Sequence, residues 1–203
     1  MAIQIGAKPE SSFADPLGLL SDCHRRIEKF QRHLTLVTER ARGGALDAEQ
    51  RQALEVALRY FQEAAPRHTR DEEDSLFPCL RAAGGLDAEA ALAALDALEA
   101  DHDTADAGHA IVDRLGRKWL AEDSLPPEET ALLGETLQRL QTLYQRHIAV
   151  EDTRLFPLAA QILDASAIQT VGHEMAERRG IDLDTLPDLK LRCPTKRDSP
   201  PAP

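Results

Sequence analysis

The sequence is poor in aromatic residues and cysteine, and it has no long hydrophobic run. Aromatic side chains make up 4% of the 203 residues. The three cysteines form no C-x-x-C pair, which excludes a disulfide framework as the basis of the fold. No segment is long and apolar enough to cross a bilayer, and the first residues lack the pattern of a signal peptide. We therefore expect a reducing, cytoplasmic location and no membrane partner.

Basic residues are in deficit as well. The chain has 24 Lys and Arg against 35 Asp and Glu, a net charge of −11. That balance argues against nucleic acid and anionic membranes as partners. The chain is instead rich in Ala, Leu, Glu and Arg, which favour helix, and its length suits one domain with a proper core.

Helix start and stop signals divide the chain. Asp15-Pro16 supplies an N-cap followed by proline at the first helical position, and Asp47 with Gln50 resembles a capping box. Pro66 predicts a kink inside the second helix. Five helices are expected, at about residues 15–43, 47–82, 87–120, 126–163 and 166–179.

Four long helices joined by short loops predict an all-α, up-down-up-down four-helix bundle. We expect the bundle to span residues 15–163, after an N-terminal arm of residues 1–14. Residues 164–203 are expected to form a short extra helix followed by an irregular, proline-rich tail.

One twelve-residue phrase occurs twice. RHTRDEEDSLFP at residues 67–78 returns as RHIAVEDTRLFP at residues 146–157, an offset of 79. The apolar stripes of the second and fourth helices match at this offset. Those of the first and third helices match at an offset of 78, so His24 corresponds in sequence to His102. The chain therefore consists of two similar helical hairpins.

The repeat predicts that histidines and glutamates meet inside the bundle. Each pair, His68/Glu72 and His147/Glu151, has i,i+4 spacing, so imidazole and carboxylate share one helix face. With a rise of about 1.5 Å per residue, all four stripe histidines fall at one level of an antiparallel bundle. These histidines are His24, His68, His102 and His147.

Four histidines and two glutamates in an apolar core point to metal. Buried carboxylates are costly unless they are paired or metal-bound, and imidazole with carboxylate suits iron, manganese or zinc. Six ligands are too many for one tetrahedral zinc. They suit two metals, each with two histidines and with Glu72 and Glu151 bridging, which leaves room for an oxo or hydroxo bridge and for a small ligand. The alternative is a metal-free helical interaction module, because an isolated H-x-x-x-E is usually an exposed ion pair.

These motifs together resemble the hemerythrin-like, or HHE cation-binding, domain. The resemblance rests on a lone histidine, H-x-x-x-E-x-x-x-L-F-P, a second lone histidine and H-x-x-x-E, and it covers roughly residues 15–163. It implies a four-helix bundle with a non-haem di-iron centre that binds oxygen or related small ligands. Carried over by motif, the ligands are His24, His68, Glu72, His102, His147 and Glu151.

The sequence departs from the oxygen carriers of that family, which have H-x-x-x-H on the third helix and H-x-x-x-x-D on the fourth. Here those helices read His102-x-x-x-Asp106 and His147-x-x-x-Glu151. The pattern looks more like the bacterial branch, which implies binding or sensing of oxygen, nitric oxide, peroxide or iron status. The alternatives are an enzyme acting on peroxide or oxygen, and iron–sulfur centre repair. Repair ranks lower because the cysteine-containing N-terminal module usual in such members is missing. The pattern does not indicate which protein partner the chain has.

Several polar residues near the expected ligands allow more than one interpretation. Glu28 and Asp106 each follow a stripe histidine by four residues and are either hydrogen-bond partners of ligands or polar residues at the stripe's edge. His109 is at the level of Gln31, and a core hydrogen bond between the two is preferred to a ligand role. Tyr144 is either a core residue or a hydrogen-bond partner of a bound ligand.

The acidic run at residues 71–74 is expected to be mostly solvated, except for Glu72. Glu73 is about 100° around the helix from Glu72 and is expected to contact a ligand or to face solvent. Cys23 adjoins His24 in sequence and is expected to point away from it.

Overall fold

The computed structural model describes residues 11–83 and 88–183, and this part of the chain is helical without any strand. The expected arm up to residue 10, the expected break at 84–85 and the tail from residue 184 lie outside the described residues. The elements are α1 (Pro16–Ala41), α2 (Ala48–Glu63), α3 (Ala65–Asp71), η1 (Glu72–Leu76), α4 (Phe77–Ala83), α5 (Ala88–Glu122), α6 (Pro127–Val150), η2 (Glu151–Leu155), α7 (Phe156–Ile162) and α8 (Ala165–Glu177).

The helix starts follow from the predicted caps. The Asp15 side chain accepts a hydrogen bond from the Gly18 backbone N–H at 3.1 Å, which opens α1. At α2 the predicted capping box is present, because Asp47 and Gln50 each accept a hydrogen bond from the other's backbone N–H.

The second and fourth expected helices are each divided into shorter segments, α2 to α4 with η1 and α6 to α7 with η2. Between α2 and α3 the helix breaks at Ala64, two residues before Pro66, as the proline predicted. The five-residue turns η1 and η2 are π-helical, because the Phe77 N–H bonds the Glu72 carbonyl and the Phe156 N–H bonds the Glu151 carbonyl. Nothing in the spacing of the repeat predicted these turns. Each begins at one of the two glutamates of the repeat.

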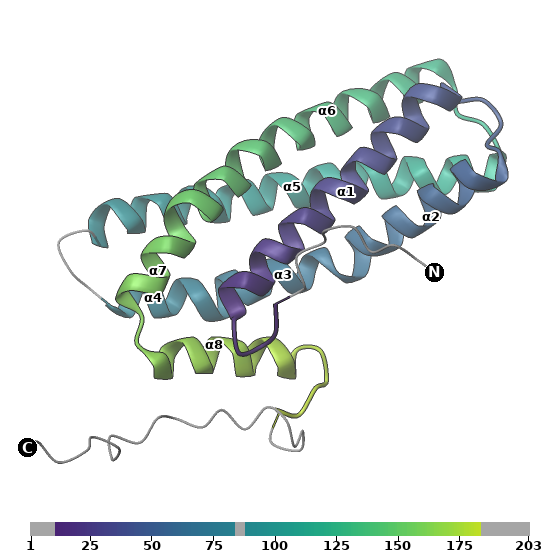
Figure 1. Cartoon of the computed structure of the whole chain (residues 1–203). Coiled ribbons are helices and arrows are strands. Elements are labelled where there is room, and N and C mark those ends of the chain that lie inside the picture. Colours follow the sequence, from purple (N-terminus) through teal and green to yellow (C-terminus); the bar gives the residue numbers. More distant parts are fainter. Residues whose placement is uncertain (1–10, 84–87, 184–203) are drawn as a thin grey trace, which may run out of the picture.

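The helices form the predicted four-helix bundle (Figure 1). α1 packs against α2 and α6, and α5 packs against the same two helices, so α1 and α5 occupy opposite corners. α8 crosses one end of the bundle and contacts α1, α3 and η1. The predicted all-α, up-down-up-down four-helix bundle with a short extra C-terminal helix is therefore confirmed.

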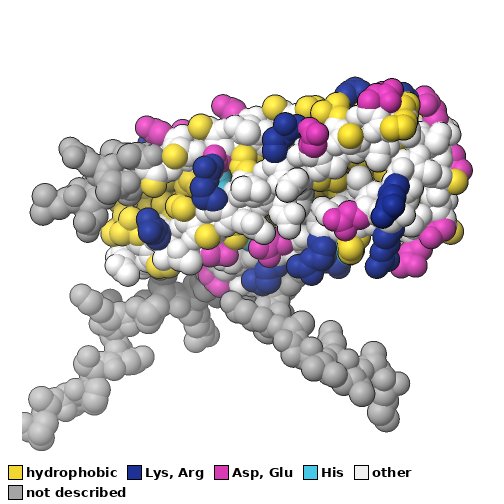
Figure 2. Space-filling view, turned by 90° about the horizontal axis from the view of Figure 1, so that it is seen from above, with side chains coloured by type: hydrophobic (Ala, Val, Ile, Leu, Met, Phe, Trp, Pro, Cys, Tyr) yellow, Lys and Arg dark blue, Asp and Glu magenta, His cyan; other side chains and the backbone are white. Residues whose placement is uncertain are grey.

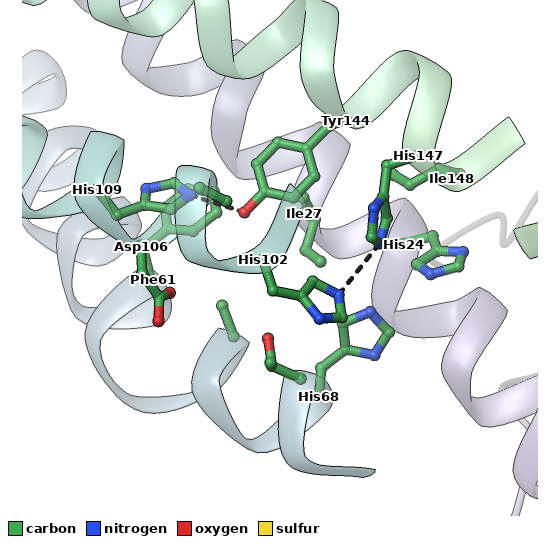
Figure 3. Close-up of a pocket in the computed structure, with 13 residues that line it drawn as sticks. His24, Ile27, Phe61, His68, His102, Asp106, His109, Tyr144, His147 and Ile148 are labelled. Atoms are coloured by element: carbon green, nitrogen blue, oxygen red, sulfur yellow. Dashed lines mark hydrogen bonds between the residues drawn. The ribbon is translucent and has the colours of Figure 1, made fainter. Parts of the chain in front are cut away.

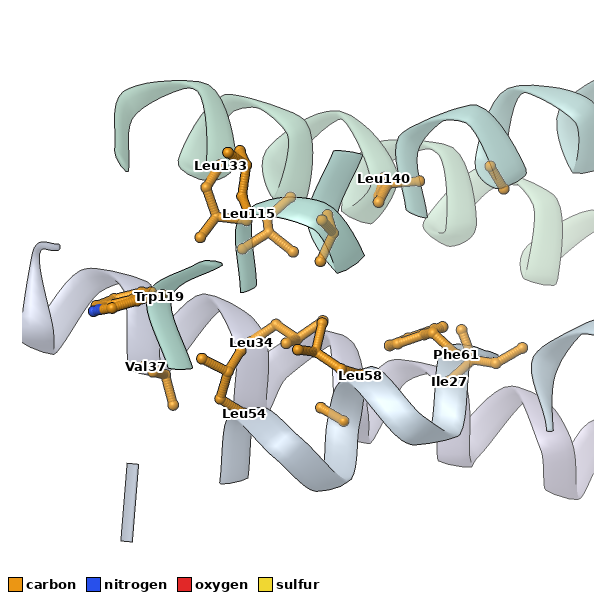
Figure 4. Close-up of a cluster of buried hydrophobic side chains, with 14 of the residues drawn as sticks. Ile27, Leu34, Val37, Leu54, Leu58, Phe61, Leu115, Trp119, Leu133 and Leu140 are labelled. Carbon is orange, nitrogen blue, oxygen red and sulfur yellow. The ribbon is translucent and has the colours of Figure 1, made fainter. Parts of the chain in front are cut away.

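Two hydrophobic clusters fill the bundle. The larger, shown in Figure 4, includes Ile27, Leu58 and Trp119, whose indole N–H donates to the Gly44 carbonyl at 2.8 Å. The second cluster contains the leucine and phenylalanine of both LFP copies: Leu76, Phe77, Leu155 and Phe156, together with Leu20. On α1, His24 lies between Leu20 of one cluster and Ile27 of the other. The polar residues of the repeat thus occupy a layer between two dry clusters.

The surface mixes both charge signs. Figure 2 shows Lys and Arg side chains interspersed with Asp and Glu over the face in view. Within the described ranges, no helix has the length and apolar character needed to cross a membrane.

Candidate metal centre

All six predicted ligands come together in the layer between the two clusters. Each is at most 7% exposed. Their ligand atoms form two groups of four, and within each group all atoms lie within 4.8 Å of one another. One group takes two histidines from the first hairpin and the other takes two from the second, while both glutamates belong to each. The groups are His24, His68, Glu72 and Glu151, and then Glu72, His102, His147 and Glu151.

The four imidazoles point their Nε2 atoms at the two carboxylates. His24 Nε2 and His147 Nε2 lie 3.1 and 3.2 Å from Glu151 Oε2. His68 Nε2 is 3.5 Å from Glu72 Oε1, and His102 Nε2 is 3.4 Å from Glu72 Oε2. The two oxygens of Glu72 therefore face the two histidine pairs separately, whereas Glu151 turns one oxygen, Oε2, toward a histidine of each pair.

The chemistry of these atoms fits metal. Both oxygens of Glu72 and of Glu151, and Nε2 of His24, are buried and make no hydrogen bond of normal geometry. Buried polar atoms normally have a partner, because leaving one without costs the desolvation energy of the group. The Nε2 atoms of His102 and His147 also face each other at 3.1 Å (Figure 3). Imidazole nitrogen and carboxylate oxygen suit iron, manganese and zinc, so the residues present fit a pair of such ions.

Carboxylates outside the cluster lie on the far side of three of the imidazoles and hydrogen-bond two of them. Asp152 Oδ1 lies 3.0 Å from His24 Nδ1, and Glu73 Oε1 lies 2.7 Å from His102 Nδ1. These contacts are related by the 79-residue offset, because each carboxylate immediately follows a shared glutamate. Carboxylates at this position fix the tautomer and orientation of a metal-binding imidazole. Glu73 was among the residues expected near a ligand, whereas Asp152 was not.

The remaining two imidazoles break the symmetry of the centre. Asp101, which precedes His102, lies with Oδ2 at 3.5 Å from His147 Nδ1. Its counterpart before His24 is Cys23, whose thiol interacts with His68 and accepts a hydrogen bond from Arg26 at 3.1 Å. Burial raises the pKa of Cys23, but His68 beside the thiol and the positive charge of Arg26 outweigh it and lower the pKa. In the second ligand group, His102 and His147 each have a carboxylate near Nδ1. In the first group, His24 has a carboxylate there and His68 lies beside the Cys23 thiol.

When metal is absent, protonated imidazoles balance the negative charge of the buried carboxylates. Burial lowers the pKa of His24, but the carboxylates of Asp152, Glu151 and Glu72 beside its ring outweigh this effect and raise the pKa to about 12. In the same way burial is outweighed at His102, where Glu72 and Glu73 raise the pKa to about 9. Because metal binds the neutral imidazole, uptake of metal must displace these protons, and it becomes weaker as pH falls.

A cavity of about 20 Å³ lies on the histidine side of the cluster. Besides the four histidines, the lining residues that Figure 3 labels are Ile27, Phe61, Asp106, His109, Tyr144 and Ile148. Ala65, Thr69 and Ala105 complete the lining. This volume has room for about one water-sized molecule. The Tyr144 hydroxyl is 2.8 Å from Nε2 of His109, whose ring stacks on Phe61 with centroids 4.1 Å apart.

The expected hydrogen bond between His109 and Gln31 is wrong. Gln31 Nε2 donates instead to the Leu137 carbonyl at 2.9 Å, and His109 pairs with Tyr144. Because α1 and α5 stand at opposite corners, each of the two side chains reaches a partner on α6, which lies beside both. His109 lines the cavity but belongs to neither ligand group.

The two uncertain acids occupy different places. Asp106 lines the cavity without joining a ligand group. Glu28 is exposed and lines a separate hollow with Arg32 and Gln145. The structure therefore brings Asp106, but not Glu28, to the cavity beside the predicted ligands.

The prediction of a solvated acidic run is wrong for Asp71. Its carboxylate is fully buried and receives hydrogen bonds from Arg178 and Arg179, which follow α8. The run could not show this contact, because its partners lie more than 100 residues further along the chain.

Substitution of His109 by glutamine is expected to reduce the loss of stability in acid. Burial lowers the pKa of His109 to about 4. The unfolded imidazole takes up a proton near pH 6.5 and the folded one does not, so stability falls between about pH 6.5 and pH 4. The expected loss from this group is about 2 kcal/mol at pH 5.

Urea unfolding of both proteins in excess chelator, at pH 7 and pH 5, measures the effect. His109→Gln should lose about 2 kcal/mol less than the parent between the two pH values. An equal loss in both proteins would contradict the assignment to His109.

Comparisons with known proteins agree with this geometry. A family model described as Hemerythrin HHE cation binding domain matches residues 15–159. A protein of Haemophilus influenzae (strain ATCC 51907 / DSM 11121 / KW20 / Rd), named as an uncharacterized protein, is 26% identical over 176 residues, which cover 84% of this chain and 94% of the relative. The match ends before α8.

Proposed function

Because the chain belongs to the hemerythrin HHE cation-binding domain family, we propose that it binds two iron ions and uses them to bind or sense one small ligand. The observation that carries this proposal is the sharing of Glu72 and Glu151 by two buried histidine pairs. When bound, a pair of iron ions supplies open coordination positions and one-electron redox chemistry. Manganese and zinc accept the same ligand atoms and are the competing metals.

The residues around the ions have separate tasks in this proposal. Glu73, Asp101 and Asp152 orient the imidazoles His102, His147 and His24. The apolar lining from Ile27, Phe61 and Ala105 keeps bulk water from the histidine side of the centre.

The size and lining of the cavity favour a diatomic ligand such as oxygen or nitric oxide. About 20 Å³ admits one such molecule, and the apolar surface from Ile27, Phe61 and Ala105 favours an uncharged one. The Tyr144 hydroxyl faces the cavity and is available to hydrogen-bond the ligand (Figure 3).

Turnover of peroxide is the second candidate, because proton-carrying groups line the same cavity. Tyr144, His109 and Asp106 all reach it. Consumption of peroxide that is lost in Glu72 or Glu151 variants would favour an enzyme, whereas binding without turnover favours a sensor or carrier.

Anaerobic reconstitution with Fe(II), followed by iron counting and an optical spectrum with and without nitric oxide, tests the proposal. Two irons per chain and a spectral change on adding one equivalent of ligand are expected. Fewer than two metals in the parent protein would contradict it.

Ala105→Val provides a sharper test of the cavity. Ala105 is 4% exposed, so two added methyl groups should fill much of the cavity and weaken nitric oxide binding roughly tenfold or more while both irons remain. Ala110→Val, at an exposed position of the same helix, is the matched control. Equal ligand affinity in the two variants would place the ligand elsewhere.

A further inference from the structure

Helix α8 is part of the packed core. Val171 and Met175 are fully buried and belong to the same cluster as Leu20. Gly172 lies against the Phe13 carbonyl, where a Cβ would collide with the oxygen. Because the family match ends at residue 159, it does not account for this helix.

Two arginines after α8 hold a carboxylate next to a predicted ligand. Asp71 directly precedes Glu72, and both are fully buried. Asp71 Oδ1 accepts from Arg178 Nη1 at 2.9 Å, and Oδ2 accepts from Arg179 Nη2 at 2.6 Å. Such fork-shaped, charge-assisted pairs fix geometry as well as charge.

The same arginines reach the turn that follows. Arg178 Nη2 donates to the Ser75 hydroxyl, which itself donates to Glu174 of α8. Asp71 precedes the π-turn η1 and Ser75 is its fourth residue, so the contacts lie near both of its ends. We call Arg178, Arg179, Asp71 and Ser75 the arginine clamp.

Among the residues that the structure describes, the second half of the chain has no such clamp. At the 79-residue offset, Val150 stands where Asp71 does, and Arg154 stands where Ser75 does. There η2 is tied to α1 by Asp152, which accepts from the Ser21 hydroxyl at 2.8 Å and contacts His24. The clamp therefore acts on the turn of Glu72 and not on that of Glu151.

We propose that Arg178 and Arg179 are positioning residues for the metal centre. By holding both ends of η1 they fix the turn that aims the Glu72 carboxylate, and so they set the metal affinity and the electronic environment of the pair. This inference rests on the proposed function. It adds that α8, outside the matched family region, determines how well the centre is formed.

The test is Arg178→Met/Arg179→Met in the full chain, with iron affinity measured by competition with a chelator. Outer partners of metal ligands are worth roughly 10–100-fold in affinity, and a loss of that size with a changed optical spectrum is expected. Val171→Ala is the control, because it lowers the melting temperature through lost packing of α8 and leaves the clamp intact. Its metal affinity and spectrum should be unchanged.

A second variant avoids leaving a buried charge unpaired. Adding Asp71→Val to the two methionines removes the carboxylate and copies the residue of the second half. The same loss of affinity is expected with less loss of stability. If either clamp variant kept the parental affinity and spectrum, the inference would fail while the proposed function stood. A parent protein without two irons would overturn the proposed function, and this inference with it.

Discussion

Replacement of both Glu72 and Glu151 by glutamine is expected to abolish stoichiometric metal binding and to leave the helical bundle folded. Both carboxylates belong to each ligand group, so their loss removes the shared negative charge from both metal positions at once. Glutamine has nearly the same shape, and it removes two buried charges whose burial is costly. Metal content after desalting and the far-UV circular dichroism spectrum measure the two outcomes.

Glu73→Gln is the matched control for this prediction. It changes the residue next to Glu72, which contacts His102 Nδ1 from outside the cluster. Its metal affinity should fall by roughly 10–100-fold, and two ions should still bind at saturating metal. Retention of two ions by the double glutamine variant would show that the metal, if bound, is held elsewhere.

Removal of metal by a chelator is expected to lower the melting temperature of the parent protein by roughly 10 °C. Metal at a thousand times its dissociation constant stabilises the folded state by about 4 kcal/mol, and each kcal/mol shifts a chain of this size by about 2–4 °C. Without metal, Glu72 and Glu151 keep unbonded oxygens in the core. Differential scanning calorimetry with and without chelator measures the shift.

Two controls test this second prediction: the dependence of the shift on pH, and the effect of chelator on the Glu72→Gln/Glu151→Gln variant. The stabilisation by metal should shrink as pH falls, because protons compete for imidazoles such as His24 and His102, whose pKa values are raised. In the Glu72→Gln/Glu151→Gln protein the chelator should have no effect. An unchanged melting temperature in the parent would favour the metal-free interaction module.

The sequence was sufficient to predict the bundle and the meeting of the six side chains. Helical phase assigns each histidine to a face, and the duplication places His24 with His102 and His68 with His147 at one level. These arguments need only the regular geometry of the α-helix. The helices that carry His68 and His147 keep it from Ala65 to Asp71 and from Pro127 to Val150.

Contacts that depend on neighbouring elements could not be predicted in this way. Residue spacing gives the height of Gln31 and His109 along the bundle, but it does not give the arrangement of their helices. Because α1 and α5 are diagonal neighbours that both pack on α6, each side chain bonds to α6 instead of to the other. Burial of Asp71 depends on two arginines beyond α8. The second copy of the repeat has Val150 and Arg154 at the positions of Asp71 and Ser75, so comparing the two copies gives no sign of that contact.

The two π-turns indicate which features of the chain are older than the duplication and which are younger. η1 and η2 begin at the shared glutamates and lie at the same place in both halves, 79 residues apart. Each acts as an inserted residue in an otherwise α-helical rod, so the simplest course is one insertion in an ancestral hairpin that was later duplicated. Pro66 and Asp71 occur in one half alone, where Gln145 and Val150 stand in the other, so these differences arose after the duplication. On this order an ancestor made of two identical hairpins already had a symmetric centre, and Asp71, whose arginine partners follow α8, is one of the positions at which the two halves now differ.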